Sequence, residues 1–291
     1  FIKFIFFNIL NSNIKILYIF DEIIMSKKAY LLDKKNLAES YIFTISSYSM
    51  RPLWTYITEK KGSKIYILNY SASFEGYKSI LDGYEESLGY DLMNWPIFIN
   101  WTKEYNEHLS KVYKNCNFVL SSRPIYYCDT KFNIKFDKKK KVVAIFDIPP
   151  NKKSFSNKNL DIYNYRTLNL TIQFLKNILD IALLKDMVIL HKPKRNYFER
   201  YDKFYFDYLQ QVSTENINYN YINSNVSPER ILKLSDFSIN APWSSTAFIS
   251  KYLKIKTAFY DPSGTIQLTD RGSQNIQLLK TLKDLEIFMD R

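Results

Sequence analysis

The chain has 291 residues, 46% of them hydrophobic and 24% charged, which is enough for one large or two medium globular domains. Its net charge is +12, but four of its lysines form one run, Lys138–Lys141, and neither zinc-finger spacing nor an RNA-recognition motif accompanies them, so nucleic acid is not the expected partner. Its two cysteines, Cys116 and Cys128, are not spaced as a metal pair, and with only two histidines the composition predicts a reducing cytoplasm and no metal site.

The first 24 residues are apolar but interrupted. Polar residues separate Phe1–Leu10 from Ile16–Phe20, so no run reaches the ~18 apolar residues that a membrane span needs. No small-residue cleavage site typical of a signal peptide follows. Met25, followed by Ser-Lys-Lys, has the features of a start. We therefore expect residues 1–24 to be either a native segment or a translated upstream one.

Strand-like and helix-like segments alternate on both sides of a charged stretch without periodicity, Lys131–Lys141, which is the predicted linker. Before it, apolar spacing predicts helices over 36–47, 74–88 and 101–113, and strands over 64–69 and 116–120. After it, the pattern predicts strands over 142–146, 187–190, 219–222, 237–240 and 257–260, and helices over 168–184, 201–212, from 228 and over 244–252. Short apolar strands that alternate with helices form parallel sheets covered by helices. The sequence thus predicts an α/β protein of two Rossmann-like domains, residues 25–135 and 141–291.

Polar residues follow four of the predicted strands, and ligands of open α/β sheets bind past the carboxyl ends of strands. Asp147 ends the first of these strands, and it either acts on a substrate hydroxyl or accepts backbone hydrogen bonds within its own turn. Asp261 lies in Tyr260-Asp-Pro-Ser-Gly264, where it is either a turn residue or a contact to a sugar or ribose.

A basic loop follows the strand at 187–190. It contains His191, Lys192, Pro193, Lys194 and Arg195. Its cationic side chains either neutralise a phosphate or form a solvated surface loop. Because neighbours in an extended loop alternate, we expect His191 and Pro193 to face a bound nucleotide, with Lys192 outward or on the sheet edge.

Three hydroxyl residues open a helix directly after the strand at 237–240. Ser244, Ser245 and Thr246 follow Pro242 and Trp243. Their hydroxyls and the helix N-terminus either form an anion site or simply cap the helix. Because this helix start and the basic loop both follow parallel strands, we expect them to converge on one pocket.

The segment Ser235–Gly264 resembles the C-terminal signature of bacterial surface-polysaccharide biosynthesis proteins. In these proteins a strand leads to a Pro-x-Ser/Thr-Ser-Thr/Pro-Ala helix start, and the next apolar strand ends in Tyr-Asp-Pro-Ser/Thr-Gly. The resemblance covers about residues 142–291. It implies a cytoplasmic glycosyltransferase that makes capsular or other surface glycans. It also implies the GT-B architecture, in which two parallel sheets face a cleft and the C-terminal half binds the donor.

The chain is also similar to transferases that use CMP-activated Kdo or sialic acid. These carry a His-Pro pair after one strand and a Ser-Ser or Ser-Thr pair at a later helix start. Ser244-Ser245-Thr246 fits this pattern, whereas His191-Lys-Pro193 contains an inserted lysine, which leaves UDP- and GDP-linked donors open beside CMP. The resemblance implies that these residues, together with Pro242, Lys194, Arg195 and Asp261, bind the donor.

The same resemblance implies a metal-independent reaction without a cofactor, because GT-B enzymes need no Asp-x-Asp motif. Asp147, or a carboxylate of the N-terminal half such as Glu85, would take the proton of the acceptor. The acceptor would be a glycan or a lipid-linked glycan, with peripheral contact to the inner membrane surface. The alternatives are a polyol-phosphate transferase of the teichoic-acid type and a non-catalytic GT-B-like binding subunit.

Overall fold

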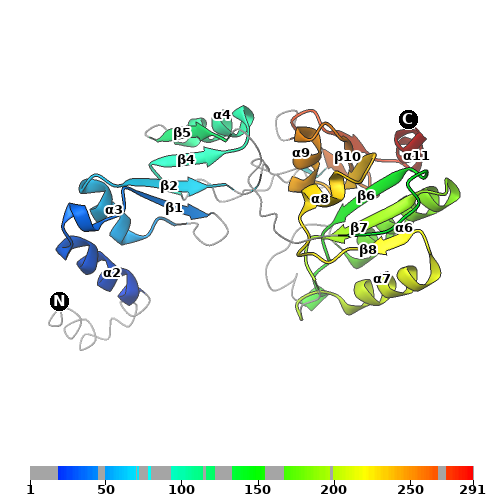
Figure 1. The fold of residues 1–291 in the computed structure, drawn as a ribbon, viewed down its shortest axis with the longest axis horizontal. Helices are drawn as coiled ribbons and strands as arrows, with labels where there is room; N and C mark the ends of the chain where they lie inside the picture. Colours follow the sequence, from blue (N-terminus) through cyan, green and yellow to red (C-terminus); the bar gives the residue numbers. More distant parts are fainter. Residues whose placement is uncertain are drawn as a thin grey trace. The chain divides into compact units, whose positions relative to one another are not determined.

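A computed structural model describes residues 19–44, 50–69, 71, 78–79, 93–113, 116–121, 133–154, 167–196, 199–267 and 273–290 (Figure 1). The chain divides into two compact units. The first comprises residues 1–70 and 89–122, and the second comprises residues 71–88 and 123–291. The second unit thus begins upstream of residues 131–141. Each unit contains its own parallel sheet, so the predicted α/β class with parallel sheets is confirmed.

The first unit has a four-stranded parallel sheet in the order β1-β2-β4-β5. The strands are β1 (Ser40–Thr44), β2 (Lys64–Leu68), β4 (Ile97–Asn100) and β5 (Asn117–Leu120), and the helices are α2 (Phe20–Leu31), α3 (Leu53–Lys60) and α4 (Lys103–Val112), with a short 3-10 turn η2 (Lys34–Asn36). Alternation along the strands buries Ile65, Ile67 and Phe98 completely. Phe43 of β1 packs between the rings of Trp54 and Trp95.

The predicted helix over 36–47 is wrong, because residues 40–44 form strand β1. The segment Ser-Tyr-Ile-Phe-Thr is rich in β-branched and aromatic residues, which fit a pleated sheet better than a helix. The predictions for β2, α4 and β5 are confirmed within a few residues. The predicted helix over 74–88 lies outside the described residues except for Lys78–Ser79. These form β3, which pairs with β11 (Ile266–Gln267) in the second unit.

Helix α2 runs continuously through residues 24 and 25, the point at which the sequence suggests a start. It packs against α3, and its Glu22 carboxylate accepts a hydrogen bond of 2.8 Å from the backbone N–H of Leu53, the first residue of α3. Among the described residues, no helix is both long and apolar enough to cross a bilayer.

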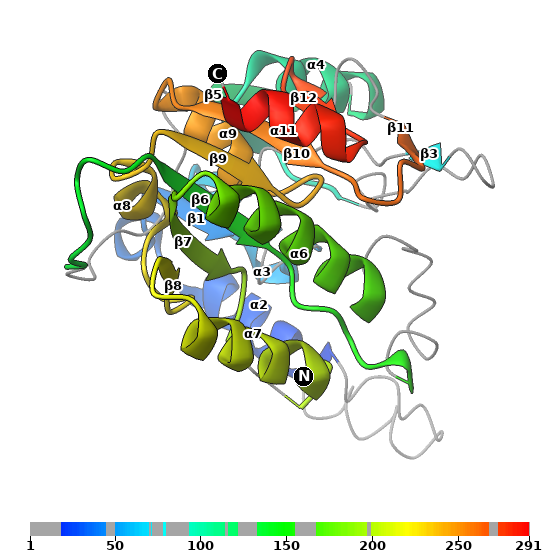
Figure 2. The same cartoon turned by 90° about the vertical axis from the view of Figure 1, so that its right-hand side faces the viewer.

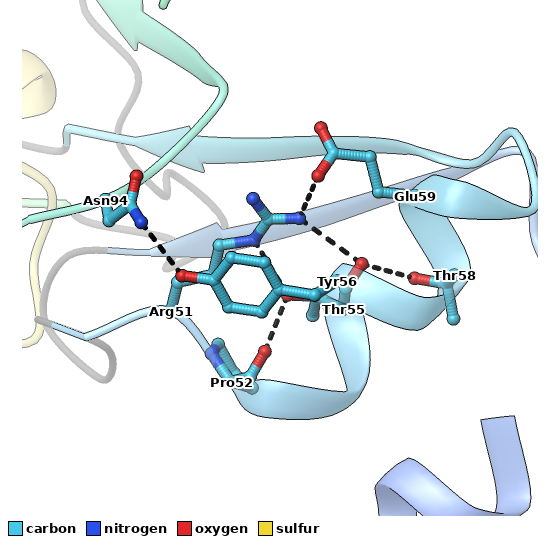
Figure 3. A network of polar contacts seen from close by, with 7 residues as sticks. All are labelled: Arg51, Pro52, Thr55, Tyr56, Thr58, Glu59 and Asn94. Carbon is cyan, nitrogen blue, oxygen red and sulfur yellow. Dashed lines mark hydrogen bonds and ion pairs between the residues drawn. The ribbon is translucent and has the colours of Figure 1, made fainter. Parts of the chain in front are cut away.

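The start of α3 is held by a buried arginine. Arg51 donates to the Thr55 hydroxyl at 2.9 Å and to the Glu59 carboxylate at 2.5 Å (Figure 3). Its guanidinium lies 3.9 Å from the centre of the Tyr56 ring, and the Asn94 amide donates to the Tyr56 hydroxyl. The Arg51 side chain is 5% exposed, so its planar guanidinium is buried between α3 and the Tyr56 ring.

Replacing Arg51 by lysine should lower the free energy of unfolding by about 1–2 kcal/mol, because an ammonium cannot reproduce the fork or its stacking on the ring. Urea denaturation followed by circular dichroism measures this. Glu59→Gln is the control. It removes the charge of the 40%-exposed partner, which should change stability by less than about 1 kcal/mol. Equal losses in both variants would show that the ion pair alone, and not the fork, stabilises α3.

The second unit has a six-stranded parallel sheet in the order β12-β10-β9-β6-β7-β8. The strands are β6 (Val142–Asp147), β7 (Val188–Pro193), β8 (Tyr219–Tyr221), β9 (Phe237–Asn240), β10 (Lys256–Tyr260) and β12 (Gln277–Leu279). The helices are α6 (Leu168–Leu184), α7 (Lys203–Glu215), α8 (Pro228–Leu232), α9 (Ser245–Tyr252) and α11 (Leu282–Asp290). This order is that of a Rossmann fold, and all five strands that the sequence predicts here are confirmed. Strand β12 and helix α11 were not predicted.

Helices cover both faces of this sheet. Figure 2 looks onto the face covered by α6, α7 and α11, with α8 and α9 behind the sheet. Val143, Ile145 and Ile189 point to the first face and form the main core with side chains of these three helices. On the second face, hydrogen bonds join α9 to β9. The Ser250 hydroxyl is paired with that of Ser238, and the Thr246 hydroxyl donates to Asn240. Successive residues of a strand therefore serve different layers, which decides where each polar side chain of the site points.

Candidate functional site

The predicted site lies at the carboxyl edge of the sheet in the second unit. The strand order reverses there, because β6 and β9 are parallel neighbours while their following helices, α6 and α9, lie on opposite faces. Such a topological switch point is where open α/β sheets bind ligands. A small hollow lies there, and its lining includes Asp147 and Ile148 at the end of β6, Ala241 and Pro242 after β9, Asp261 and Pro262 after β10, and Leu170, Thr171 and Phe174 of α6.

Asp147 is the last residue of β6 and is almost completely buried. The Tyr205 hydroxyl of α7 donates to its Oδ2 at 2.5 Å. Burial, and then the negative charge of Asp147, raise the pKa of Tyr205, so this hydroxyl keeps its proton and remains a donor. Oδ1 of Asp147 accepts no hydrogen bond in the structure. Asp147 borders the hollow, is held by Tyr205 and has one buried oxygen that accepts no hydrogen bond.

His191 is fully buried on the same face as Asp147. Its Nδ1 lies 2.6 Å from the Tyr219 hydroxyl of β8, and its Nε2 lies 3.1 Å from Oδ1 of Asp147. The second contact has the distance of an ion pair but not the alignment of a hydrogen bond, since both atoms have no hydrogen-bond partner. His191 therefore points towards α7, on the opposite face from α9. The expected convergence of His191 with Ser244 on one pocket is not met.

Lys192 takes the position that the sequence analysis gave to His191. It pairs in register with Phe146, which pairs with Asn240, so its side chain shares the α8 and α9 face with Asn240. The residue is only 6% exposed, so of the two predicted positions, outward or on the sheet edge, the outward one is wrong. Burial lowers the pKa of Lys192 to about 8, although the charge of Asp147 opposes this effect. Keeping Lys192 charged near the carboxyl edge of the sheet therefore lowers the stability of the folded protein.

The rest of the basic loop is less enclosed. Pro193 ends β7 and is buried, while Lys194 and Arg195 are exposed. The backbone N–H of Lys194 donates to the carbonyl of Asp147 at 2.9 Å and fixes the loop to the end of β6. Of the predicted cations, only Lys192 is buried beside the site.

A strained turn connects β9 to α9. The backbone N–H of Ser244 donates to the carbonyl of Ala241 at 3.1 Å, and Trp243 has a φ of 61°. A positive φ at the third position of such a turn is usually left to glycine, and a non-glycine residue there adds about 1–3 kcal/mol of strain. The Trp243 ring packs edge-on against Phe259. Strain of this kind is concentrated at ligand sites, which agrees with the position of the turn.

A chain of hydrogen bonds organises the hydroxyl residues of α9. Thr246 donates to the amide oxygen of Asn240, and the Asn240 amide donates to the carbonyl of Ala258. Since the Thr246 hydroxyl has a single hydrogen, Ser244 must be the donor in its 2.6 Å contact with Thr246. Ser244 therefore has no hydrogen left for a ligand. Ser245 lies 2.7 Å from the Ser71 hydroxyl, and either can be the donor.

Ser244 occupies the N-cap position of α9, but its side chain makes no capping hydrogen bond. The first backbone N–H groups of a helix have no partner within the helix. The simple capping role that the sequence left open for these serines is therefore not what the structure shows. The start of α9 presents N–H groups and the positive end of the helix dipole.

Asp261 satisfies its own loop. Its Oδ1 accepts from the backbone N–H and the hydroxyl of Ser263, and its Oδ2 accepts from the backbone N–H of Ile266. These contacts favour the turn role over a sugar contact, although the residue borders the hollow. Glu85 lies outside the described residues. No group of three or more His, Cys, Asp or Glu residues able to hold a metal is found in the described part of the chain.

The sequence matches the profile of the polysaccharide biosynthesis PFTS motif proteins over residues 1–289. The chain belongs to this family. The stretch Pro242-Trp-Ser-Ser245 has a proline, an aromatic residue and two hydroxyl residues in the order that the family's name gives. This stretch is the strained turn and the start of α9. No curated protein matches the chain by sequence.

Two solved structures are similar in part. The UDP-GlcNAc 2-epimerase of Methanocaldococcus jannaschii, crystallised with UDP-GlcNAc and UDP, aligns at 8% identity with a TM-score of 0.46, over 91% of this chain and 72% of its own. The spinosyn forosaminyltransferase SpnP aligns at 8% identity with a TM-score of 0.44, over 87% of this chain and 66% of its own. Because these similarities are low, we assign the site of this chain from its own geometry alone.

The structure adds residues to the site that sequence reasoning missed. Tyr205 and Tyr219 hold Asp147 and His191, and Asn240 orients the hydroxyls of α9. Asn240 could have been found from the sequence, because it is the polar last residue of the predicted strand 237–240. The two tyrosines could not have been found in this way in a chain with 24 tyrosines.

Proposed function

We propose that this chain is a glycosyltransferase that moves a sugar from a nucleotide-activated donor to a polysaccharide or a lipid-linked glycan. The observation that carries the proposal is the uncapped start of α9, which follows a strained turn at the switch point of a Rossmann-type sheet. Membership of a polysaccharide biosynthesis family supports it, because building a polysaccharide requires glycosidic bonds to be formed.

The donor phosphate binds, in this proposal, between the start of α9 and Lys192. The backbone N–H groups of the first turn and the helix dipole attract an anion. Lys192 supplies a positive charge on the same face of the sheet, and its burial strengthens its interaction with a phosphate. When the glycosidic bond to the donor breaks, negative charge grows on the departing phosphate. Fixed donors and a buried cation stabilise that charge without reorganisation.

Asp147 has a second role in the proposal. Its carboxylate is oriented by Tyr205, and the residue lines the hollow. Its Oδ1 accepts no hydrogen bond and lies 3.1 Å from Nε2 of His191. A carboxylate oxygen in this position accepts a hydrogen bond from a hydroxyl group. We assign that hydroxyl to the ribose or the sugar of the donor, which would be positioned for transfer.

The direct test is calorimetric titration of the protein with CMP, UDP, GDP and CDP. One of them should bind, and an activated sugar of the same nucleotide should be turned over in the presence of a glycan acceptor. A protein that binds the nucleotide but never consumes the donor would be a binding subunit. Absence of binding for all four nucleotides would contradict the proposal.

Ser245→Ala should weaken nucleotide binding by about tenfold, since it removes a hydroxyl that can donate to the phosphate. Ser244→Ala is the matched control at the neighbouring position. Its hydroxyl already donates to Thr246, so its loss should lower the melting temperature and change the affinity less. If Ser244→Ala weakens binding more than Ser245→Ala, the hydrogen-bond order given above is reversed.

A further inference from the structure

Three consecutive large apolar side chains are exposed at the end of α2. Tyr30 is 65% exposed, Leu31 is 67% exposed and Leu32 is 41% exposed. Single apolar residues on a surface are ordinary, but a contiguous group of them marks an interaction site. Tyr30 and Leu31 are the last two residues of α2, and Leu32 is its C-cap.

Lysines flank these three apolar residues on both sides in the sequence. Lys27 and Lys28 precede it, and Lys34 and Lys35 follow it, all four exposed. The only carboxylate between residues 27 and 35 is that of Asp33, so this stretch carries a net charge of +3, from four lysines and one aspartate. We call the four lysines together with Tyr30, Leu31 and Leu32 the tip patch.

The tip patch is held in place by the first unit. The ammonium of Lys61, at the end of α3, donates to the carbonyls of Ala29, Tyr30 and Leu32, and so closes the C-terminus of α2. Its Nζ also lies 5.7 Å from the Tyr30 ring centre, and that of Lys27 lies 5.3 Å from the same ring. The exposed side chains are therefore presented by an ordered backbone.

We propose that the tip patch binds the surface of an anionic lipid bilayer. Leucine side chains insert at the boundary between lipid headgroups and acyl chains, and tyrosine is enriched at the same boundary. Lysine ammonium groups bind lipid phosphates while their aliphatic stems stay in the apolar layer. The excess of positive charge favours a membrane surface rich in anionic headgroups. Each lysine near such a surface raises the binding constant about fivefold. This surface acts independently of the nucleotide site.

The experiment is co-sedimentation of the full chain with vesicles. Vesicles of equal parts phosphatidylcholine and phosphatidylglycerol should retain the protein, and vesicles of phosphatidylcholine alone should retain it much less. Added salt should weaken retention on the anionic vesicles. The double variant Lys34→Gln/Lys35→Gln should lose about 25-fold in binding constant, at about fivefold for each lysine.

Two controls separate the patch from overall charge and overall apolarity. Lys138→Gln/Lys139→Gln removes the same charge from another exposed stretch, and it should retain most of the binding. Leu31→Ser should weaken binding, whereas Leu184→Ser, at a position 88% exposed in the second unit, should not. Equal losses in the two lysine variants would overturn the proposal. So would a self-associated chain that Leu31→Ser converts to a monomer, because the patch would then bind a second copy.

Discussion

Lys192→Met is expected to weaken nucleotide binding about ten- to a hundredfold and, at the same time, to stabilise the protein at neutral pH. A hydrogen bond between the ammonium and a phosphate contributes roughly 1.5–3 kcal/mol, which gives the loss of affinity. Methionine has a similar length and no charge to desolvate. The fall in the pKa of Lys192 from 10.5 to about 8 corresponds to at most about 3 kcal/mol of destabilisation, which the substitution removes.

The stability and the nucleotide affinity of the protein should also depend on pH through Lys192. Below pH 8 the folded protein keeps a buried charge on Lys192, and the unfolded chain pays no such penalty. Between pH 8 and 10.5 the folded protein releases this proton while the unfolded chain retains it, so the contribution of Lys192 to stability becomes more favourable as pH rises. Nucleotide affinity should fall over the same interval, because the cation is lost. Lys192→Met should show neither the rise in stability nor the fall in affinity over this pH interval. Urea unfolding and calorimetric titration of the variant and the unmodified protein measure the two quantities.

Arg195→Met is the matched control, since it removes a cation from the exposed end of the same loop. It should leave stability unchanged and affect affinity less than Lys192→Met. A Lys192→Met protein that is more stable but binds nucleotide as before would show that the lysine is merely tolerated in the core. A variant that is less stable would show that the ammonium has a partner that offsets its burial.

Most of the second unit could be predicted from the sequence, because strands β6, β7 and β9 are buried along their whole length. Val142–Asp147 and Phe237–Asn240 are bounded by turns and stand out from their surroundings. The first unit was harder. Its strands are short and half-exposed, as in Ser40–Thr44, so their periodicity is easily confused with that of a helix.

The site was predicted at the level of loops but not of side chains. The loops after β6, β7 and β9 were found because turns and polar residues follow apolar strands there. The faces of His191 and Lys192 were exchanged, because the prediction ended the strand at Leu190 and treated the next residues as a loop. The strand continues to Pro193, so its alternation is fixed by the register with β6. A single residue of register decides which of the two side chains faces α9.

Tyr205→Phe is expected to lower the free energy of unfolding by about 1.5–3 kcal/mol. The substitution keeps the ring and removes only the hydroxyl that donates to Asp147, a hydrogen bond of 2.5 Å to a buried carboxylate. Because burial raises the pKa of Tyr205, the hydroxyl is a donor at every pH near neutrality, and the loss should not depend on pH there. Urea unfolding of both proteins measures the difference.

Tyr208→Phe on the same helix is the control. This side chain is half-buried and should lose little stability, so a comparable loss there would assign the effect to general packing of α7. Two binding measurements then separate support of the fold from positioning of a ligand. If Asp147 holds a hydroxyl of the donor, Tyr205→Phe should weaken binding of the nucleotide and leave binding of inorganic pyrophosphate unchanged. If both ligands bind as before, the contact between Tyr205 and Asp147 stabilises the core alone, and another residue must hold the donor's hydroxyl.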